Sequence, residues 1–253
     1  MIDTHCHLDT PAFDDDRDAV IARAVAAGLT GMLVPGIRPR MWDALRTLCG
    51  RHPQLRYAIG IHPQVVPDLA ADEQRTDLAA WLADAAGDAV AIGECGLDGS
   101  TAHRARQEEI FRAHIRAARV VSKPLVVHVL RAHDTASRIL REERAHEVGG
   151  VMHSYSGSPD LVKVYADLGF AFSFAGPVTY PNARKPVEAA RAVPAQLLLA
   201  ETDAPDQSPR QGTRSEPAFV AQVVAGLAAA RGEPVAEVAR RTSENARRVF
   251  RTW

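Results

Sequence analysis

The sequence predicts a single (β/α)₈ TIM barrel, an α/β fold in which each of eight parallel strands is followed by a helix. Three observations point to it: a length of 253 residues, short apolar runs alternating with amphipathic segments, and polar residues where the apolar runs end. A chain of this length is the usual size of one closed barrel. We therefore expect one domain over residues 1–253, with extra helices at the C-terminus.

Eight short runs have the apolar, β-rich composition of buried parallel strands. They lie at residues 2–5, 31–35, 56–62, 89–94, 125–128, 150–153, 170–174 and 197–201. Helical periodicity recurs between them, at residues 18–27, 77–86, 104–121, 135–144 and 161–168. Gly28, Gly87 and Gly169 stand where three of these helices should stop. The tail, residues 216–250, predicts two more helices that cover the barrel.

Strands that alternate with helices specify a parallel sheet, and eight such units most economically close into a barrel. The structural alternative is a doubly wound open sheet. In that fold a glycine-rich phosphate-binding turn commonly follows the first strand. Here His5-Cys6-His7 stands at that point, which favours the barrel.

The composition is that of an ordinary globular protein, with 46% hydrophobic and 24% charged residues. A formal charge of -1 gives no electrostatic reason for non-specific binding to duplex DNA. The N-terminal residues have neither a basic region nor a long apolar stretch, and three cysteines are too few for a disulfide framework. We therefore expect a cytoplasmic protein without a membrane span, and nothing in the sequence indicates an obligate protein partner.

His5 and His7 end the first predicted strand. Residues i and i+2 of a strand point to the same side, so both rings can face the barrel interior. Interior positions are normally apolar, and polar rings there need a metal ion or hydrogen bonds. The pair alone is compatible with a metal site and with a purely structural role.

Four more ligand-type residues stand at the ends of other strands. Glu94, His128 and His153 end the fourth, fifth and sixth strands, and Asp203 follows the eighth. Each alone has an ordinary explanation as a cap, a core histidine or a turn residue. Together they lie at the carboxyl ends of the strands, where barrel enzymes place their active sites. Six ligands of mixed nitrogen and oxygen type suit two divalent ions that share a bridging carboxylate.

Several motifs at these strand ends carry a resemblance to a known family. They are Ile2-Asp3-Thr4-His5-Cys6-His7-Leu8-Asp9, Gly60-Ile61-His62-Pro63, His153-Ser154-Tyr155-Ser156-Gly157-Ser158 and Glu201-Thr202-Asp203-Ala204-Pro205. Over essentially the whole chain the sequence resembles the TatD-family metal-dependent hydrolases, also described as TatD deoxyribonucleases. Two segments, Gly176-Pro177-Val178-Thr179-Tyr180-Pro181 and Ala204-Pro205-Asp206, are most similar to the YjjV-type subgroup.

The resemblance implies a TIM barrel with a two-metal, phosphodiesterase-like site. It implies that His5, His7, Glu94 and Asp203 surround one ion, and that Glu94, His128 and His153 hold the second. It further implies a deoxyribonuclease of the 3′-end exonuclease type, acting on DNA ends or short single-stranded DNA. The identity of the two divalent ions stays open between Mg, Mn and Zn, because histidines and carboxylates tolerate all three.

Physical chemistry supports catalytic roles for Glu94 and Asp203. A bridging Glu94 would neutralise two dications and keep them close enough to share a water, whose pKa they would lower toward neutrality. Asp203 can accept the proton of that attacking water, as a carboxylate within hydrogen-bond reach does. Asp203 is therefore the candidate general base.

His62 and Arg131 are candidates for substrate binding, and for a cation that stabilises charge on a phosphoryl oxygen. His62 can instead orient the turn at Pro63, and Arg131 can be a solvated helix residue. Many relatives carry arginine two residues after the strand-five histidine, whereas this chain has Leu130 there, with Arg131 beside it. This departure weakens the expectation that Arg131 contacts a phosphate.

Tyr155 and Tyr180 can stack a base or simply pack the rim. A related hydrolase could use the same bridged water on a small ester, amide or aminoacyl substrate, because fold and metal site do not fix the leaving group. A non-catalytic binding module is disfavoured by the full ligand set.

Overall fold

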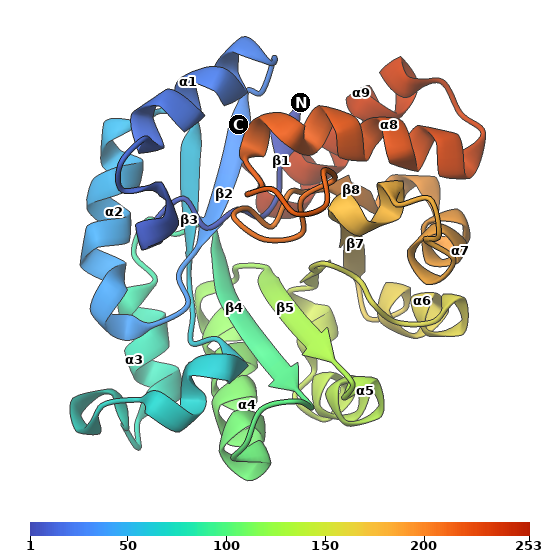
Figure 1. The fold of residues 1–253 in the computed structure, drawn as a ribbon. Helices are drawn as coiled ribbons and strands as arrows, with labels where there is room; N and C mark the ends of the chain where they lie inside the picture. Colours follow the sequence, from blue (N-terminus) through green and yellow to red (C-terminus); the bar gives the residue numbers. More distant parts are fainter.

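In the computed structural model, which describes residues 1–253, eight parallel strands follow one another in chain order (Figure 1). They are β1 (Ile2–Asp3), β2 (Gly31–Pro35), β3 (Leu55–Ile59), β4 (Ala91–Asp98), β5 (Leu125–Leu130), β6 (Gly150–Met152), β7 (Phe170–Phe174) and β8 (Leu198–Ala200). Backbone hydrogen bonds join the last strand to the first, from Thr4 N to Ala200 O (3.1 Å) and from Asp203 N to His5 O (2.9 Å). The sheet therefore closes on itself, and the predicted barrel is confirmed.

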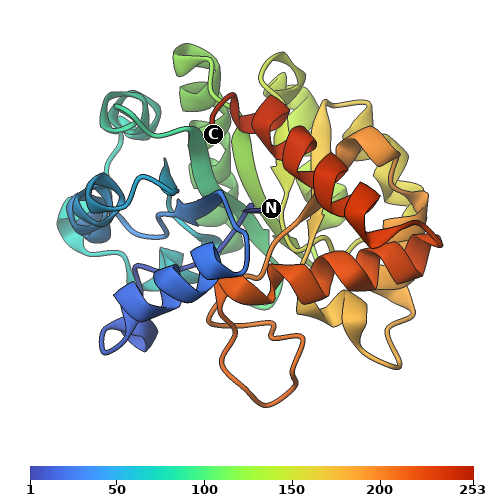
Figure 2. The same cartoon turned by 90° about the horizontal axis from the view of Figure 1, so that it is seen from above.

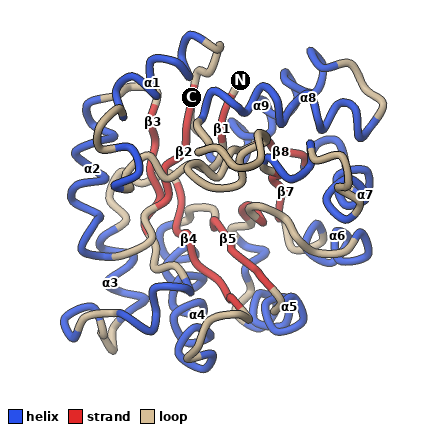
Figure 3. Tube along the Cα trace, in the orientation of Figure 1, coloured by secondary structure: helices blue, strands red, loops and turns tan.

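Helices fill the connections and surround the strands (Figure 3). They are α1 (Arg17–Ala26), α2 (Trp42–Arg51), α3 (Leu78–Ala85), α4 (Arg104–Val121), α5 (His133–Glu142), α6 (Pro159–Ala166), α7 (Lys185–Ala192), α8 (Val220–Arg231) and α9 (Val235–Phe250). The five helices expected from periodicity lie at or near their predicted bounds, and α2 and α7 fill two further connections. None of the helices combines the length and the apolar character that a membrane crossing needs.

The core shows why only one end of the barrel is free for a site. Each strand contributes one side chain to a single interior cluster: Ile2, Leu33, Ala58, Ala91, Val126, Val151, Ala171 and Leu199. Ala246 and Phe250 of α9 belong to the same cluster, so this helix covers the amino-terminal end of the barrel. Figure 2 shows α8 and α9, in orange and red, lying across the molecule. The predicted covering role of the tail is confirmed, and the carboxyl ends of the strands remain open.

Several strands end at other residues than predicted. β1, β6 and β8 stop before the ligand-type residues, so His5, His153 and Asp203 lie in the loops that follow. β4 and β5 continue past Glu94 and His128. The physical reason is the hydrogen-bond register: β4 and β5 pair with each other beyond these positions, whereas β6 ends where its pairing with β7 ends. An apolar run in the sequence does not contain this information.

Candidate metal centre

A cavity of about 700 Å³ opens at the carboxyl ends of the strands. Five predicted ligands line it: His7, Glu94, His128, His153 and Asp203. The sixth, His5, is fully buried and lies in contact with Glu94. The structure thus brings together all six residues that the sequence suggested as ligands, from loops and strands far apart in the chain.

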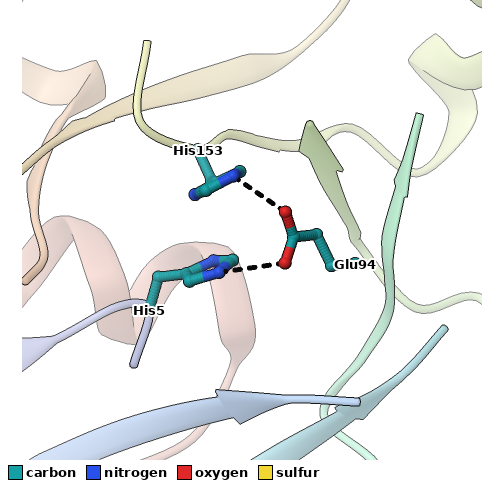
Figure 4. Close-up of side chains that lie close together, drawn as sticks. All are labelled: His5, Glu94 and His153. Carbon is teal, nitrogen blue, oxygen red and sulfur yellow. Dashed lines mark ion pairs between the residues drawn. The ribbon is translucent and has the colours of Figure 1, made fainter. Parts of the chain in front are cut away.

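Glu94 occupies the middle of this group, and its two oxygens face different histidines. Oε2 lies 3.1 Å from His5 Nε2 and 3.5 Å from His7 Nε2. Oε1 lies 2.9 Å from His153 Nε2 and 3.3 Å from His128 Nδ1. Figure 4 shows the carboxylate between the rings of His5 and His153, with one oxygen turned to each. This is the arrangement that a carboxylate bridging two ions requires.

Asp203 completes the group around Oε2 of Glu94. Its Oδ1 lies 3.6 Å from Nε2 of both His5 and His7. The amide of Gln207 donates a hydrogen bond to the other oxygen, Oδ2, which turns Oδ1 toward the histidines. The potential ligand atoms of His5, His7 and Asp203 all lie within 4.8 Å of one another. These three residues can therefore hold one ion.

Two carboxylates that sequence reasoning did not select lie behind the histidines. Oδ2 of Asp98 is 3.3 Å from His128 Nε2, and Oε1 of Glu201 is 3.4 Å from His153 Nδ1. A carboxylate at one ring nitrogen favours the tautomer that leaves the other nitrogen unprotonated. Asp98 and Glu201 both follow apolar runs, and this position in the sequence could have marked them as candidate functional residues. The sequence does not show which histidine each carboxylate faces, because this depends on how other strands pack beside it.

His62 lies in the cavity, in the loop after β3, and contacts Glu94. Gln64 N donates to His62 Nδ1 (3.2 Å). Because a backbone N–H can only donate, Nε2 of the neutral ring carries the proton, and it lies 2.9 Å from Glu94 Oε1. Burial lowers the pKa of His62 despite the nearby carboxylate. In this arrangement His62 is a hydrogen-bond donor to Glu94, and its role in substrate binding stays a prediction.

Arg131 lies apart from these residues. It directly follows β5, its side chain is exposed, and it is absent from the lining of the cavity, which Leu130 joins instead. It forms no ion pair and no side-chain hydrogen bond. Its role in substrate binding stays a prediction that no contact supports. Tyr155 is buried and packs against Phe172, so it serves the rim rather than a base.

The carboxylates and histidines of this group shift one another's pKa values. Burial alone would raise the pKa of Glu94, but His62, His153 and His5 hold it well below its usual range. His7, His153 and His5 outweigh burial at Asp203, whose pKa falls to about 2. Conversely, Asp203 and Glu94 overcome the effect of burial at His7 and raise its pKa to about 9.

The donor set fits divalent cations. Glu94 Oε2 is buried and accepts no hydrogen bond, and a buried carboxylate oxygen without a donor needs a cation nearby. The imidazole nitrogens and carboxylate oxygens of the whole group come from five strands or the loops that follow them. This combination is the ligand chemistry of zinc and manganese sites, and its carboxylates also suit magnesium.

Comparisons with known proteins agree with this geometry. The family model described as TatD related DNase matches residues 2–251. The chain is 35% identical to the metal-dependent hydrolase YabD of Bacillus subtilis, over 99% of each protein. It is 32% identical to a Pantoea ananatis protein named 3′-5′ ssDNA/RNA exonuclease TatD, again over 99% of each. The crystal structure of Escherichia coli YjjV, a TatD homologue, superposes with a TM-score of 0.91 at 31% identity, covering 100% of this chain and 98% of YjjV. The chain therefore belongs to the TatD-related DNase family of metal-dependent hydrolases, as its strand-end motifs predicted.

Proposed function

We propose that the protein is a two-metal phosphodiester hydrolase that removes nucleotides from the 3′ ends of DNA or of short single strands. The observation that carries this proposal is the central position of Glu94, whose two oxygens face separate groups of histidines. One bridging carboxylate flanked by two ligand groups is the architecture of two-metal phosphodiesterases. Magnesium, manganese and zinc are all compatible with the donor set.

The ligands divide around Glu94. His5, His7 and Asp203 would hold one ion with Oε2. His128, through Nδ1, and His153, through Nε2, would hold the second with Oε1. We exclude the nearby His62 from this set because its Nε2 carries a proton. Two bound divalent ions would supply a water of lowered pKa and positive charge for the phosphoryl oxygens.

The residues of the chain have separate tasks in the hydrolysis. Asp203 takes the proton of the attacking water. Its low pKa keeps the carboxylate ionised at neutral pH, as a proton acceptor must be. His62 donates a hydrogen bond from Nε2 and holds Glu94 in its bridging orientation. Asp98 and Glu201 keep His128 and His153 in the tautomers that ligation requires.

The relatives support a nucleic-acid substrate. Two relatives from Pantoea species, at 32% and 33% identity, are named 3′-5′ ssDNA/RNA exonucleases. The near-neutral charge of this chain argues for an end or a short strand rather than a long duplex, because tight duplex binding needs many cationic contacts.

A specific observation favours a second candidate, the hydrolysis of a small ester, amide or aminoacyl substrate. No lysine or arginine lines the cavity, so no fixed cation waits there for a polyanion. The same metal-activated water could then attack a carbonyl carbon instead of phosphorus.

One activity screen separates the two candidates. The protein is reconstituted with manganese, magnesium or zinc and given labelled single-stranded DNA, duplex DNA, small phosphodiesters, and small esters and aminoacyl esters. We expect shortening of single-stranded DNA from its 3′ end and hydrolysis of the small diesters. Turnover of the carboxylic esters alone would replace the first candidate with the second. The Asp203→Asn variant, carried through the same screen, excludes a contaminating nuclease.

A further inference from the structure

One charged residue lines the cavity without belonging to the metal centre. Among the lining residues, Asp206 is the only aspartate, glutamate, lysine or arginine apart from Glu94 and Asp203. Its side chain is exposed to solvent and forms no ion pair. The cavity thus carries an unpaired carboxylate, a few residues along the chain from the proposed general base.

The backbone on both sides of Asp206 is firmly held. Asp206 N donates to Asp203 O (2.9 Å), and Ser215 N donates to Pro205 O (2.8 Å). On the other side, the amide of Gln207 donates to Asp203 Oδ2 and to Ser154 Oγ (2.7 Å). The loop that follows β8 therefore keeps the carboxylate at the cavity.

This charge limits what the cavity can accept. Bound metal ions would neutralise the phosphate that is to be cleaved. A second phosphate on the same terminal nucleotide finds no lysine or arginine among the lining residues and shares the cavity with the carboxylate of Asp206. In water, two unit charges at a separation of ~4 Å repel enough to weaken binding about 5-fold, and a cavity wall strengthens the effect.

We infer that Asp206 is a specificity-determining residue that selects terminal nucleotides with an uncharged 3′-hydroxyl and rejects those with a 3′-phosphate. The substrate class is accordingly a nucleotide end with a single phosphate in the cavity. This inference rests on the proposed phosphodiesterase function. It also explains how a cavity without fixed cations can act on a polyanion: only one phosphate of the strand enters.

Nucleotide binding tests the inference without requiring turnover. Thymidine 5′-monophosphate and thymidine 3′,5′-bisphosphate are titrated by calorimetry into metal-loaded wild type, Asp206→Asn and Asp88→Asn. Asp88 is the matched control, because it is exposed and lies just before β4, at the opposite end of the barrel. We expect wild type and Asp88→Asn to prefer the monophosphate, and Asp206→Asn to lose at least about 5-fold of that preference.

A kinetic arm uses two oligonucleotides of one sequence that end in a 3′-hydroxyl or a 3′-phosphate. The ratio of their kcat/KM values should fall by the same factor in Asp206→Asn and stay unchanged in Asp88→Asn. An unchanged preference in Asp206→Asn, in either arm, overturns the inference. If the nucleotides show the expected preference but no oligonucleotide is cleaved, the proposed function fails while the selectivity of Asp206 stands. A protein that binds neither nucleotide contradicts both.

Discussion

Glu94 links the two halves of the metal centre at the scale of single residues. Its oxygens are shared between His5 and His7 on one side and His128 and His153 on the other. A neutral amide at this position can neither neutralise two dications nor bridge them equally well. Each of these histidines, by contrast, faces only one of the two oxygens.

This difference predicts unequal metal losses. Glu94→Gln should reduce the affinity for both ions together, whereas His128→Ala should deplete mainly one. Elemental analysis of the purified variants, after equilibration with a limiting concentration of manganese, measures both. Equal loss of both ions in the two variants would show that Glu94 is not the sole bridge.

Asp203 combines metal contact with proton transfer, and one substitution separates them. Asp203→Asn keeps the size and one ligating oxygen but cannot take a proton. We expect kcat to fall by roughly 10²- to 10⁴-fold, with a smaller change in KM and much of the metal retained. Turnover and bound metal are measured on the same preparation. Full activity with normal metal content would remove Asp203 from the mechanism.

At the scale of elements, the close approach of β3 to β4 positions Glu94. A Cβ added at Gly60 would lie 2.3 Å from Gly93 C and 2.6 Å from Glu94 N, distances that no side chain can adopt. Only glycine therefore allows the end of β3 to lie against the backbone of the bridging residue.

Gly60→Ala should force the two segments apart and displace Glu94. We expect a lower melting temperature and a weaker affinity for metal ions than in a variant with a substitution at the surface. Gly50→Ala is the control, because Gly50 lies in α2 with no neighbouring atom within 4 Å of the added Cβ. It should leave metal binding unchanged and slightly stabilise the helix. Normal metal affinity in Gly60→Ala would contradict the positioning role.

A buried histidine joins α4 to the segment that carries His62. Ile61 N donates to His114 Nε2 (3.0 Å), and His114 Nδ1 lies 2.7 Å from Ile110 O. Burial lowers the pKa of His114 from 6.5 to about 4. Below pH 6.5 the unfolded chain gains a proton that the folded chain does not, so this group lowers the free energy of unfolding as the pH falls toward 4.

The resulting loss is about 3 kcal/mol between pH 6.5 and pH 4. His114→Gln retains an acceptor and a donor but does not titrate, so its free energy of unfolding should fall less over this range. Urea unfolding of the metal-free protein at several pH values measures the difference. Parallel pH dependence in the two proteins would assign the acid sensitivity to other groups.

At the scale of the whole molecule, the metal centre ties the barrel together. Its six proposed ligands come from β4, β5 and the loops after β1, β6 and β8. None of these contacts exists in the unfolded chain, so ions bound to the folded state alone stabilise it by mass action.

Saturating manganese should raise the melting temperature of the metal-free protein. At a concentration 100 times the Kd, the gain is about 2.7 kcal/mol for each site, which corresponds to several degrees for a chain of this size. Differential scanning fluorimetry with and without a chelator measures the shift. Glu94→Gln should show a smaller one. A shift of the same size in Glu94→Gln would place the stabilising ions elsewhere.

Local pattern alone determined the fold class, all helices except α2 and α7, and the identity of the six ligand-type residues. Apolar periodicity specifies strands and helices because it reflects which face of each element is buried. The carboxyl ends of parallel strands meet at one end of a barrel, so a histidine or carboxylate after each strand predicts a shared site. His5, His7, Glu94, His128 and His153 required no more information than this.

Only the tertiary structure decided how those residues face one another. Asp98 of β4 faces His128 of the neighbouring strand β5, whereas Glu201, after β8, faces His153, which follows β6. Gln64 fixes the tautomer of His62. Arg131 is exposed and does not line the cavity, whereas Asp206 does. These outcomes depend on strand register and on loop contacts between residues far apart in the chain. Local periodicity cannot encode them, because it describes the burial of one element and not the orientation of its neighbours.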